Sequence, residues 1–168
     1  MISDVLDFTR GHLGGGIPVE PTEGDLAEIC HRVVDETKAI NPQREIIFHA
    51  TGDLSGRWDR PRLEQVISNL LGNAVQHSRG ERPVTLRVGG DGDDLMLQVT
   101  NHGSLIAPEH LQSIFDLFVR VGQSDGLGGG GLGIGLALAQ RFVQMHGGRL
   151  EARSDGPGKG SEFSIWLP

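Results

Sequence analysis

Uncharged polar residues recur along one predicted helix in a pattern unlike that of an ordinary solvent-facing surface. Between residues 60 and 78, Gln65, Asn69, Asn73 and His77 repeat every four positions, which places them in one row. Asn is a poor helix former, and exposed helical rows usually carry Glu, Lys and Arg. Amide oxygens can bind a hard cation or a polar ligand. The row is therefore a candidate site, and a plain amphipathic surface is the alternative.

A glycine-rich loop precedes a second helix that could take part in binding. Residues 122–135 read GQSDGLGGGGLGIG, and Gly131, Gly133 and Gly135 alternate directly before an apolar helical segment. Glycines at a helix entrance let the backbone approach a ligand and aim free N–H groups at an anion. A flexible linker is the alternative, although the abrupt passage into an apolar helix argues against it. A P-loop is excluded because no Gly-Lys-Ser/Thr follows, and a dinucleotide fold because the loop follows a helix.

Two further segments carry groups that could contact a nucleotide. Asn101 and Gly103 end a predicted strand, where a polar side chain can read the edge of a base. Phe115 and Phe118 shortly precede Arg120. Aromatic rings close to an exposed arginine could clamp a mobile loop and present the guanidinium group to phosphate. Core phenylalanines and a surface arginine are the alternative interpretation.

The pattern of apolar residues predicts an α+β domain. Helices are predicted at residues 24–38, 60–78, 108–118 and about 132–146. Strands are predicted at residues 17–19, 44–50, 57–59, 84–88, 95–101, 149–153 and 162–167, with a hairpin turn at 90–93. Strict β-α-β alternation is absent. This favours a two-layer α/β sandwich, in which a mixed, mostly antiparallel sheet of about five strands is covered on one face by about three helices.

The composition narrows the function classes. The chain has 168 residues, one cysteine and a formal net charge of −7. A net acidic surface works against sequence-independent nucleic-acid binding, which needs clustered Lys and Arg. A single cysteine excludes an internal disulfide and a multi-cysteine metal site. No apolar stretch reaches the roughly 18 residues of a membrane helix, and no basic-then-apolar leader opens the chain, so we expect a cytoplasmic location.

Together and in this order, the segments resemble the catalytic and ATP-binding domain of bacterial sensor histidine kinases. That domain belongs to a nucleotide-binding superfamily shared with type II topoisomerases and heat-shock chaperone ATPases. The matching segments are 59–74 (N box), 101–103 (first glycine box), 115–120 (F box), 131–136 (second glycine box), and the closing elements 146–148 and 158–161. The resemblance covers essentially the whole chain and implies the Bergerat ATP-binding fold.

The resemblance also implies roles for individual residues. Asn73 would hold the Mg²⁺ that bridges the ATP phosphates, with Asn69 beside it in the metal site, and Asn101 would contact the adenine amine. Arg120 and the N–H groups of the second glycine box would meet the phosphates, and residues 104–130 would form the ATP lid. The other residues expected to bind ATP are His77, Gly103, Phe115, Phe118, Gly131, Leu132, Gly133, Ile134, Gly135, Leu136 and Ser161.

The implied activity is transfer of the ATP γ-phosphate to a histidine on a dimerisation domain. None of the seven histidines has the sequence context of the phosphoacceptor. The acceptor is therefore expected in another part of a larger, homodimeric kinase, with a response regulator as the next partner. Residues 1–13 would end the second dimerisation helix, or form an ordinary N-terminal helix, and residues 14–168 would be the catalytic domain. The fragment itself is expected to be a monomer that does not autophosphorylate alone.

Several positions depart from the family pattern. Asn101 replaces the usual Asp, Leu105 replaces a glycine, and Gln76 stands where a basic residue commonly helps the phosphates. An amide oxygen can still accept from the adenine amine, but a neutral bond contributes about 0.5–1.5 kcal/mol instead of about 1.5–3. A degenerate, non-catalytic nucleotide-binding or protein-interaction domain is therefore the alternative.

A hydrolase of the same superfamily is a third hypothesis. The related ATPases carry Glu in place of Asn69, and an amide cannot take a proton from water at neutral pH, so this hypothesis is disfavoured. The kinase interpretation depends on one spatial prediction. The amide row and the glycine-lined helix entrance, with Asn73 and Gly133 as their representatives, should face each other across a single cavity.

Overall fold

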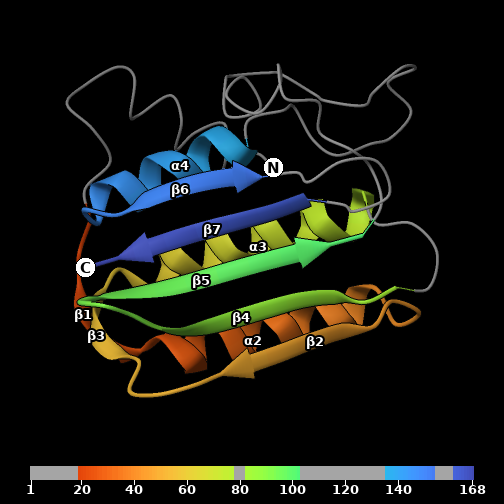
Figure 1. Cartoon of the computed structure of the whole chain (residues 1–168), viewed down its shortest axis with the longest axis horizontal. Coiled ribbons are helices and arrows are strands. Elements are labelled where there is room, and N and C mark those ends of the chain that lie inside the picture. The colour runs from red at the N-terminus through yellow and green to blue at the C-terminus, as the bar shows by residue number, and fades with distance from the viewer. Residues whose placement is uncertain (1–18, 78–81, 103–134, 154–160) are drawn as a thin grey trace.

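The framework of the domain is a twisted sheet with helices on one face (Figure 1). The computed structural model describes residues 19–77, 82–102, 135–153 and 161–168. Within these ranges a five-stranded sheet has the order β2-β4-β5-β7-β6, and a two-stranded sheet pairs β1 with β3. β2 and β4 are parallel, and all other neighbours are antiparallel. The predicted two-layer α+β sandwich with a mixed, mostly antiparallel sheet is confirmed.

The elements follow one another in a β-α-β-β-α-β-β-α-β-β order within the described ranges. The helices are α2 (Leu26–Ile40), α3 (Arg60–His77) and α4 (Gly135–Met145). The strands are β1 (Thr22–Asp25), β2 (Ile46–Ala50), β3 (Ser55–Trp58), β4 (Val84–Asp91), β5 (Asp94–Asn101), β6 (Arg149–Arg153) and β7 (Ser161–Leu167). In these ranges, no helix combines the length and the apolar character that a membrane crossing requires.

The first strand differs from the prediction. The expected strand at residues 17–19 falls mostly outside the described residues, and Val19 is not part of a strand. β1 begins at Thr22 instead and pairs with β3, so that Thr22 lies opposite Trp58. Its sequence, Thr-Glu-Gly-Asp, has no apolar alternation that could signal a strand. The pairing with β3 is a tertiary contact, and a local pattern does not reveal it.

Capping residues set the ends of α2 and explain why it is displaced from the predicted 24–38. The Asp25 carboxylate accepts a hydrogen bond from the Ala27 N–H at 2.8 Å, so Asp25 is the N-cap and the helix starts at Leu26. At the other end, the Asn41 main-chain and side-chain N–H groups both donate to the Thr37 carbonyl oxygen at 3.0 Å.

The hairpin between β4 and β5 is tighter than predicted. The strands extend to Asp91 and resume at Asp94, which pair with each other and leave a two-residue turn. Gly92 has a positive φ of 65°, a conformation that such turns require and that glycine adopts without strain. The other described boundaries lie within two residues of the prediction. The helix predicted at 108–118 and the first residues of the helix predicted at 132–146 lie outside the described residues.

The core lies between the three helices and the sheet. Each of the two helices α2 and α3 buries an apolar face, made of Leu26, Ile29, Cys30, Val33 and Val34 on α2 and of Leu63, Val66, Ile67, Leu70, Leu71 and Ala74 on α3. Each fully buried aliphatic side chain contributes about 1.5–3 kcal/mol relative to an exposed one. The sheet supplies Val84, Leu86, Val88, Leu97, Val99, Phe163, Ile165 and Leu167. Because alternate strand residues point to the same face, Asn101 at the end of β5 also points toward the helices.

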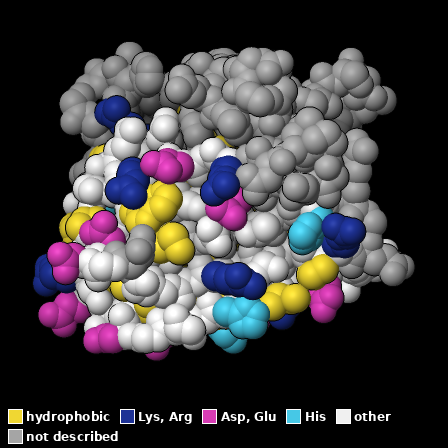
Figure 2. Space-filling model, viewed as in Figure 1, with side chains coloured by type: hydrophobic (Ala, Val, Ile, Leu, Met, Phe, Trp, Pro, Cys, Tyr) yellow, Lys and Arg dark blue, Asp and Glu magenta, His cyan; other side chains and the backbone are white. Residues whose placement is uncertain are grey.

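The opposite face of the sheet carries charges of both signs beside hydrophobic side chains (Figure 2). Trp166 is opposite Met96 on one neighbouring strand and Arg149 on the other. The Arg149 guanidinium lies 4.1 Å from the Trp166 ring centroid and 3.4 Å from the Glu151 carboxylate. Such mixing is typical of a solvated surface. The candidate site residues of α3, α4, β5 and β7 belong to the helical side of the sheet.

A buried joint connects the start of α3 with the end of α4. Asp59, which is 7% exposed, accepts from the Glu20 N–H at 3.0 Å and from the Arg62 N–H at 3.3 Å through its carboxylate. Its main-chain N–H donates to His146 Nε2 at 3.0 Å, and His146 Nδ1 donates to the Phe142 carbonyl oxygen at 2.7 Å. The N-terminus of α3 therefore lies beside the C-terminus of α4, and the two packed helices are antiparallel (Figure 1).

Two glycines end α4 and bring it against β7. The Gly148 N–H donates to the Val143 carbonyl oxygen and the Gly147 N–H to the Gln144 carbonyl oxygen, at 3.0 and 2.9 Å. Gly147 has a φ of 80°. This is the Schellman arrangement. At Gly148 a Cβ atom would overlap the main-chain oxygen of Trp166, so the close approach of α4 to β7 requires the absence of a side chain.

Replacing Gly148 with Ala is expected to destabilise the domain by at least about 1–3 kcal/mol, because the backbone of β7 must move. Gly72→Ala is the matched control. Nothing lies within 4 Å of a Cβ at Gly72, which is an exposed position of α3. Alanine there should raise the free energy of unfolding by about 0.5–1 kcal/mol. Urea denaturation followed by circular dichroism measures both changes, and equal midpoints for the two variants would contradict the packing argument.

Burial raises the pKa of the Cys30 thiol to about 12, with a smaller contribution from the nearby Asp25 carboxylate. At pH 8 the thiolate fraction in the folded chain is then about a thousandfold smaller than in an unfolded one, and only the thiolate reacts. Alkylation by iodoacetamide should therefore be slow in the native protein and fast in urea. Mass spectrometry of timed samples checks this, and equal rates would show that the thiol is accessible.

Candidate functional site

The amide row lies on one flank of α3. Gln65, Asn69 and Asn73 are all partly buried and belong to one continuous helix, so their four-residue spacing places them on the same side. His77 is the last residue of α3, and its side chain lies outside the described part of the structure. The sequence prediction of a shared row is confirmed for the three residues whose side chains are described.

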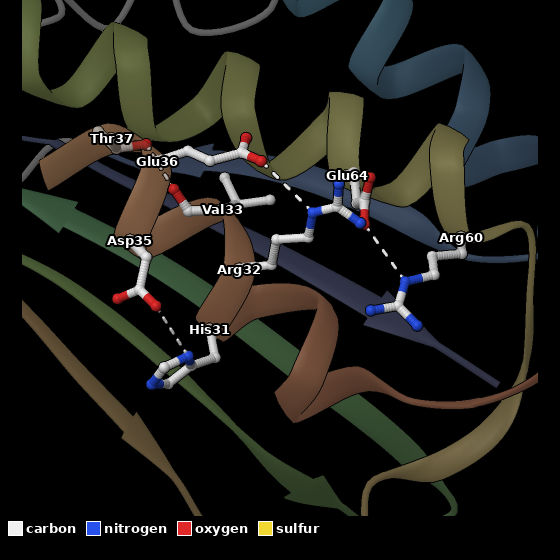
Figure 3. Close-up of polar contacts among 8 residues, drawn as sticks. All are labelled: His31, Arg32, Val33, Asp35, Glu36, Thr37, Arg60 and Glu64. Atoms are coloured by element: carbon white, nitrogen blue, oxygen red, sulfur yellow. Dashed lines mark hydrogen bonds and ion pairs between the residues drawn. The ribbon is translucent and has the colours of Figure 1, made fainter. Parts of the chain in front are cut away.

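Another flank of α3 carries Arg60 and Glu64 and faces α2 (Figure 3). Glu64 is 3.3 Å from the Arg60 guanidinium on its own helix and 3.6 Å from Arg32 on α2. Arg32 also pairs with Glu36 at 3.4 Å. Such exposed pairs contribute at most about 1 kcal/mol each. This flank is an ordinary solvated surface, and the neutral row on the other flank is the feature that requires an explanation.

The start of α4 lies level with the amide row. The Arg62 guanidinium sits 5.1 Å from the centroid of the Phe142 ring, which aligns the two antiparallel helices near the joint at Asp59. Both helices rise about 1.5 Å per residue. His146 lies beside Asp59, and Gly135 is eleven residues before His146. In the antiparallel helix α3, the residue at the same height as Gly135 is therefore about eleven residues after Asp59, near Leu70. Gly135, which ends the glycine-rich loop, lies at the height of Asn69 and Asn73.

Asn101 and Ser161 are in direct contact below the same part of α3. They are register partners on β5 and β7, and they are 2% and 7% exposed. The Asn101 Oδ1 atom accepts from the Ser161 N–H at 3.1 Å and from the Ser161 hydroxyl at 2.6 Å. Its Nδ2 atom donates to the carbonyl oxygen of Ala74 at 3.3 Å. Two predicted ligand-binding residues from distant parts of the sequence are therefore joined, directly beside Asn73.

The sequence did not indicate the main-chain partners in this arrangement. The Ala74 carbonyl oxygen and the Ser161 N–H are main-chain groups that almost every residue has, so the residue types do not indicate these contacts. The role of His146 in aligning the helices was also not predicted, although its segment matched a closing element of the family. A histidine followed by two glycines was the available signal, because the glycines mark the end of a helix next to a strand.

Several predicted positions lie outside the described residues. They are Gly103, Phe115, Phe118, Arg120, Gly131, Leu132, Gly133 and Ile134, together with the expected lid at 104–130 and the expected dimerisation segment at 1–13. Gly135 and Leu136 are described and form the first residues of α4, where Leu136 packs against the core. The predicted cavity between Asn73 and Gly133 accordingly remains a prediction.

The described site offers amide and hydroxyl groups but few charges. Among the described residues, no group of three or more His, Cys, Asp or Glu side chains could hold a metal ion. A metal at the row would thus take only one or two ligands from amide oxygens. Mg²⁺ commonly binds in this way, because it keeps several waters and takes further oxygens from substrate phosphates. The donor set therefore fits a magnesium ion that arrives with a phosphate ligand.

Comparison with known proteins places this arrangement in a family. Residues 58–168 match the family described as histidine kinase-, DNA gyrase B- and HSP90-like ATPases. The chain belongs to this family. The match covers both the amide row and the Asn101–Ser161 pair, so the candidate site lies within the family's domain.

The curated relatives of this ATPase-family chain include sensor kinases. It is 38% identical to the circadian input-output histidine kinase CikA of Synechococcus elongatus, over 100% of this chain and 23% of that protein. It is 33% identical to the alginate biosynthesis sensor protein KinB of Pseudomonas aeruginosa, over 100% of this chain and 28% of that protein. The chain thus spans roughly a quarter of the length of these relatives. The predicted resemblance to sensor histidine kinases is confirmed.

Solved structures of the family have the same fold. The catalytic domain of histidine kinase ThkA is 26% identical with a TM-score of 0.74, and the match covers 89% of this chain and 95% of that one. Full-length ShkA in complex with AMPPNP is 27% identical with a TM-score of 0.84, over 99% of this chain and 35% of that one. The described elements therefore share the fold of these histidine kinase structures.

Replacing Asn101 with Leu is expected to lower the free energy of unfolding by about 2–4 kcal/mol without any ligand, because it removes the side-chain partner of the buried Ser161 N–H and one hydrogen bond to the Ala74 carbonyl oxygen. Thermal and urea denaturation measure the loss. Gln144→Leu, at an exposed position of α4, is the control and should change stability by less than about 0.5 kcal/mol. Equal midpoints for both variants would show that the hydrogen bonds of Asn101 to Ser161 and Ala74 do not stabilise the domain.

Proposed function

We propose that this domain is the ATP-binding catalytic part of a sensor histidine kinase. It would transfer the γ-phosphate of ATP to a histidine on the dimerisation domain of the same kinase. The observation that carries this proposal is the convergence of three features at one end of the helical layer. These are the neutral flank of α3 at Asn69 and Asn73, the start of α4 at Gly135, and the buried Asn101–Ser161 pair.

The proposed ligand is ATP with Mg²⁺. The Asn101–Ser161 pair would contact the adenine base, since it is the buried polar group of the site. The amide oxygen of Asn73, with Asn69 beside it, would contribute to a magnesium ion bound mainly by phosphate oxygens. The relative ShkA has been solved with AMPPNP, an ATP analogue, which supports a nucleotide ligand for this fold.

The remaining ligand contacts are proposed from the family pattern. Arg120 would lie near the phosphates, His77 and Gly103 would also contact ATP, and Phe115 and Phe118 would hold the lid. The N–H groups at the start of α4 would meet phosphate oxygens, because the first N–H groups of a helix have no partner within it. Gly135 and Leu136 supply such groups at the start of α4, and the preceding Gly131, Leu132, Gly133 and Ile134 would add N–H groups as the family pattern implies.

The chemistry of the row favours transfer to an incoming nucleophile over hydrolysis. An amide at position 69 has no basic site that could take a proton from water at neutral pH. Phosphoryl transfer depends mainly on positioning and on stabilising the charge of the phosphate oxygens. Both tasks suit amides, a magnesium ion and helix N–H groups. The imidazole of a separate dimerisation domain would supply the nucleophile.

The proposal includes the partners of the parent kinase. The dimerisation domain would hold two copies of the catalytic domain in a homodimer, and a response regulator would receive the phosphate. The isolated chain would be a monomer that acts on a dimerisation domain supplied separately. A cytoplasmic location follows from this role, because the ATP pool and the response regulator are there. No nucleic-acid partner is proposed.

Binding of AMPPNP should depend on both Mg²⁺ and Asn73. We expect Asn73→Ala to weaken AMPPNP binding in the presence of Mg²⁺ by at least about tenfold, the usual loss when a group that supports a metal is removed. Isothermal titration with Mg²⁺ or with EDTA measures this. Ser68→Ala, at an exposed position on the same helix, is the control and should bind like the wild type. Unchanged affinity of Asn73→Ala would refute the metal role.

The transfer step is tested in the same preparation by adding a dimerisation domain from a sensor kinase and radiolabelled ATP. An acid-labile, base-stable label on that domain is the expected product, because phosphohistidine has this stability. If ATP binds but only multiple-turnover phosphate release is seen, the chain is a hydrolase. If no nucleotide binds at millimolar concentration, it is a degenerate interaction domain.

A further inference from the structure

The five-stranded sheet has two edge strands, and they differ in charge. β6, at one edge, carries Arg149, Glu151 and Arg153 among its five residues. Charged side chains on an edge strand are a common protection against pairing with another chain. β2, at the other edge, reads Ile-Ile-Phe-His-Ala and has no Lys, Arg, Asp or Glu. It therefore lacks the protection that β6 has.

The hydrogen bonds between β2 and β4 show which main-chain groups of β2 remain at the edge. The Glu45 carbonyl oxygen accepts from β4, and the Thr51 N–H donates to β4, both at 3.0 Å. In a parallel ladder, alternate residues bond to the same neighbouring strand, so the odd-numbered residues of β2 bond to β4. The even-numbered residues direct their N–H and C=O groups away from it, where no further strand pairs within the described ranges. These residues are Ile46, Phe48 and Ala50.

The side chains along this edge change from acidic to basic on the face of the sheet away from the helices. Because alternate residues share a face and Ile46 is buried under the helices, Glu45, Ile47 and His49 lie on the other face. His49 is the register partner of Arg87 on β4, and both side chains are exposed, as is Glu45. Figure 2 shows this order along the lower edge of the sheet as an acidic, a hydrophobic and a basic region.

This order makes the edge complementary to a second copy of itself. If two β2 strands pair antiparallel with Ile47 at the centre, the Ile47 side chains of the two copies lie opposite each other. Each Glu45 then lies opposite the His49 of the other copy, with that copy's Arg87 one strand further on. Opposite charges and apolar pairs placed directly across two strands stabilise their pairing.

The same register fits the main chain and the helical face. It places Ile46 opposite the Phe48 of the second copy. Both residues have outward N–H and C=O groups, so they can exchange hydrogen bonds as a regular antiparallel pair does. The Phe48 side chain is half-buried, and its ring centroid lies 6.2 Å from that of His31 on α2. Pairing would remove more of its apolar surface from water.

We infer that the edge of β2 is an interaction surface for a second copy of this domain, and that two copies join their sheets by antiparallel pairing of β2 about a two-fold axis. β2 carries none of the candidate nucleotide-binding residues, so this pairing is independent of the proposed function. Two short strands bury less than the roughly 1,200–2,000 Å² of a stable complex. The isolated chain would therefore stay a monomer at micromolar concentration. Two copies would pair where a homodimeric parent holds them at a roughly millimolar effective concentration.

Sedimentation equilibrium of the chain without nucleotide tests the pairing up to about 1 mM, the effective concentration within a parent dimer. A reversible dimer should form toward this limit. Glu45→Lys places a cation beside His49 and Arg87 of the other copy and should raise the dissociation constant at least about tenfold. Adding His49→Glu to that variant makes the charges opposite again and should restore the dimer. Glu151→Lys, the same change on β6, is the control and should pair like the wild type.

Amide hydrogen exchange followed by NMR locates the interface. Between a dilute and a concentrated sample, exchange should slow for the N–H groups of Ile46 and Phe48. The N–H groups of Ile47 and His49 should change little, because they already bond to β4. A wild-type chain that stays monomeric at about 1 mM would overturn the inference. A dimer that Glu45→Lys leaves intact, or one without this alternation, would overturn it too. AMPPNP titration judges the proposed function separately.

Discussion

The hydrogen bond between the Asp59 main chain and His146 aligns the two helices on which the candidate site depends. The His146 Nδ1–H donates to the Phe142 carbonyl oxygen, and its Nε2 atom accepts from the Asp59 main-chain N–H. A main-chain N–H can only donate and a main-chain carbonyl oxygen can only accept, so these two partners fix the orientation of the His146 ring. Moving α4 by one helical turn, about 5.4 Å, would break it. The same shift would carry Gly135 away from the level of Asn73.

In this alignment, the different sides of α3 have different surroundings. Its apolar stripe packs in the core, its charged flank pairs with Arg32 of α2, and its amide flank faces the side from which α4 begins. Two asparagines in the middle of a helix cost roughly half a kilocalorie per mole or more each relative to alanine. The buried stripe offsets this cost several times over. Such a local violation of helix preference is expected where a residue serves a ligand instead of the fold.

Sequence periodicity was sufficient for the parts of the fold that follow local rules. The shared flank of Asn69 and Asn73 follows from 3.6 residues per turn, so their four-residue spacing predicted it correctly. β1 was missed because its four residues have no apolar alternation and form a strand only through pairing with β3. The contact between Asn101 and Ser161 was not predicted, although both were expected to bind ATP. Residues sixty positions apart in the chain meet here through strand pairing, which local patterns do not encode.

The partners of Asn101 weigh against the interpretation that this position has decayed. An apolar side chain at this position would remove the partner of the buried Ser161 N–H and one donor to the Ala74 carbonyl oxygen, and a buried group left unpaired costs about 1–3 kcal/mol. Asparagine satisfies both, and it is the residue of this size that can accept at one end and donate at the other. The amide is therefore integrated into the surrounding structure as well as into the site. Asn101 thus joins β5, β7 and α3 through its side chain, which gives this position a structural reason to carry an amide.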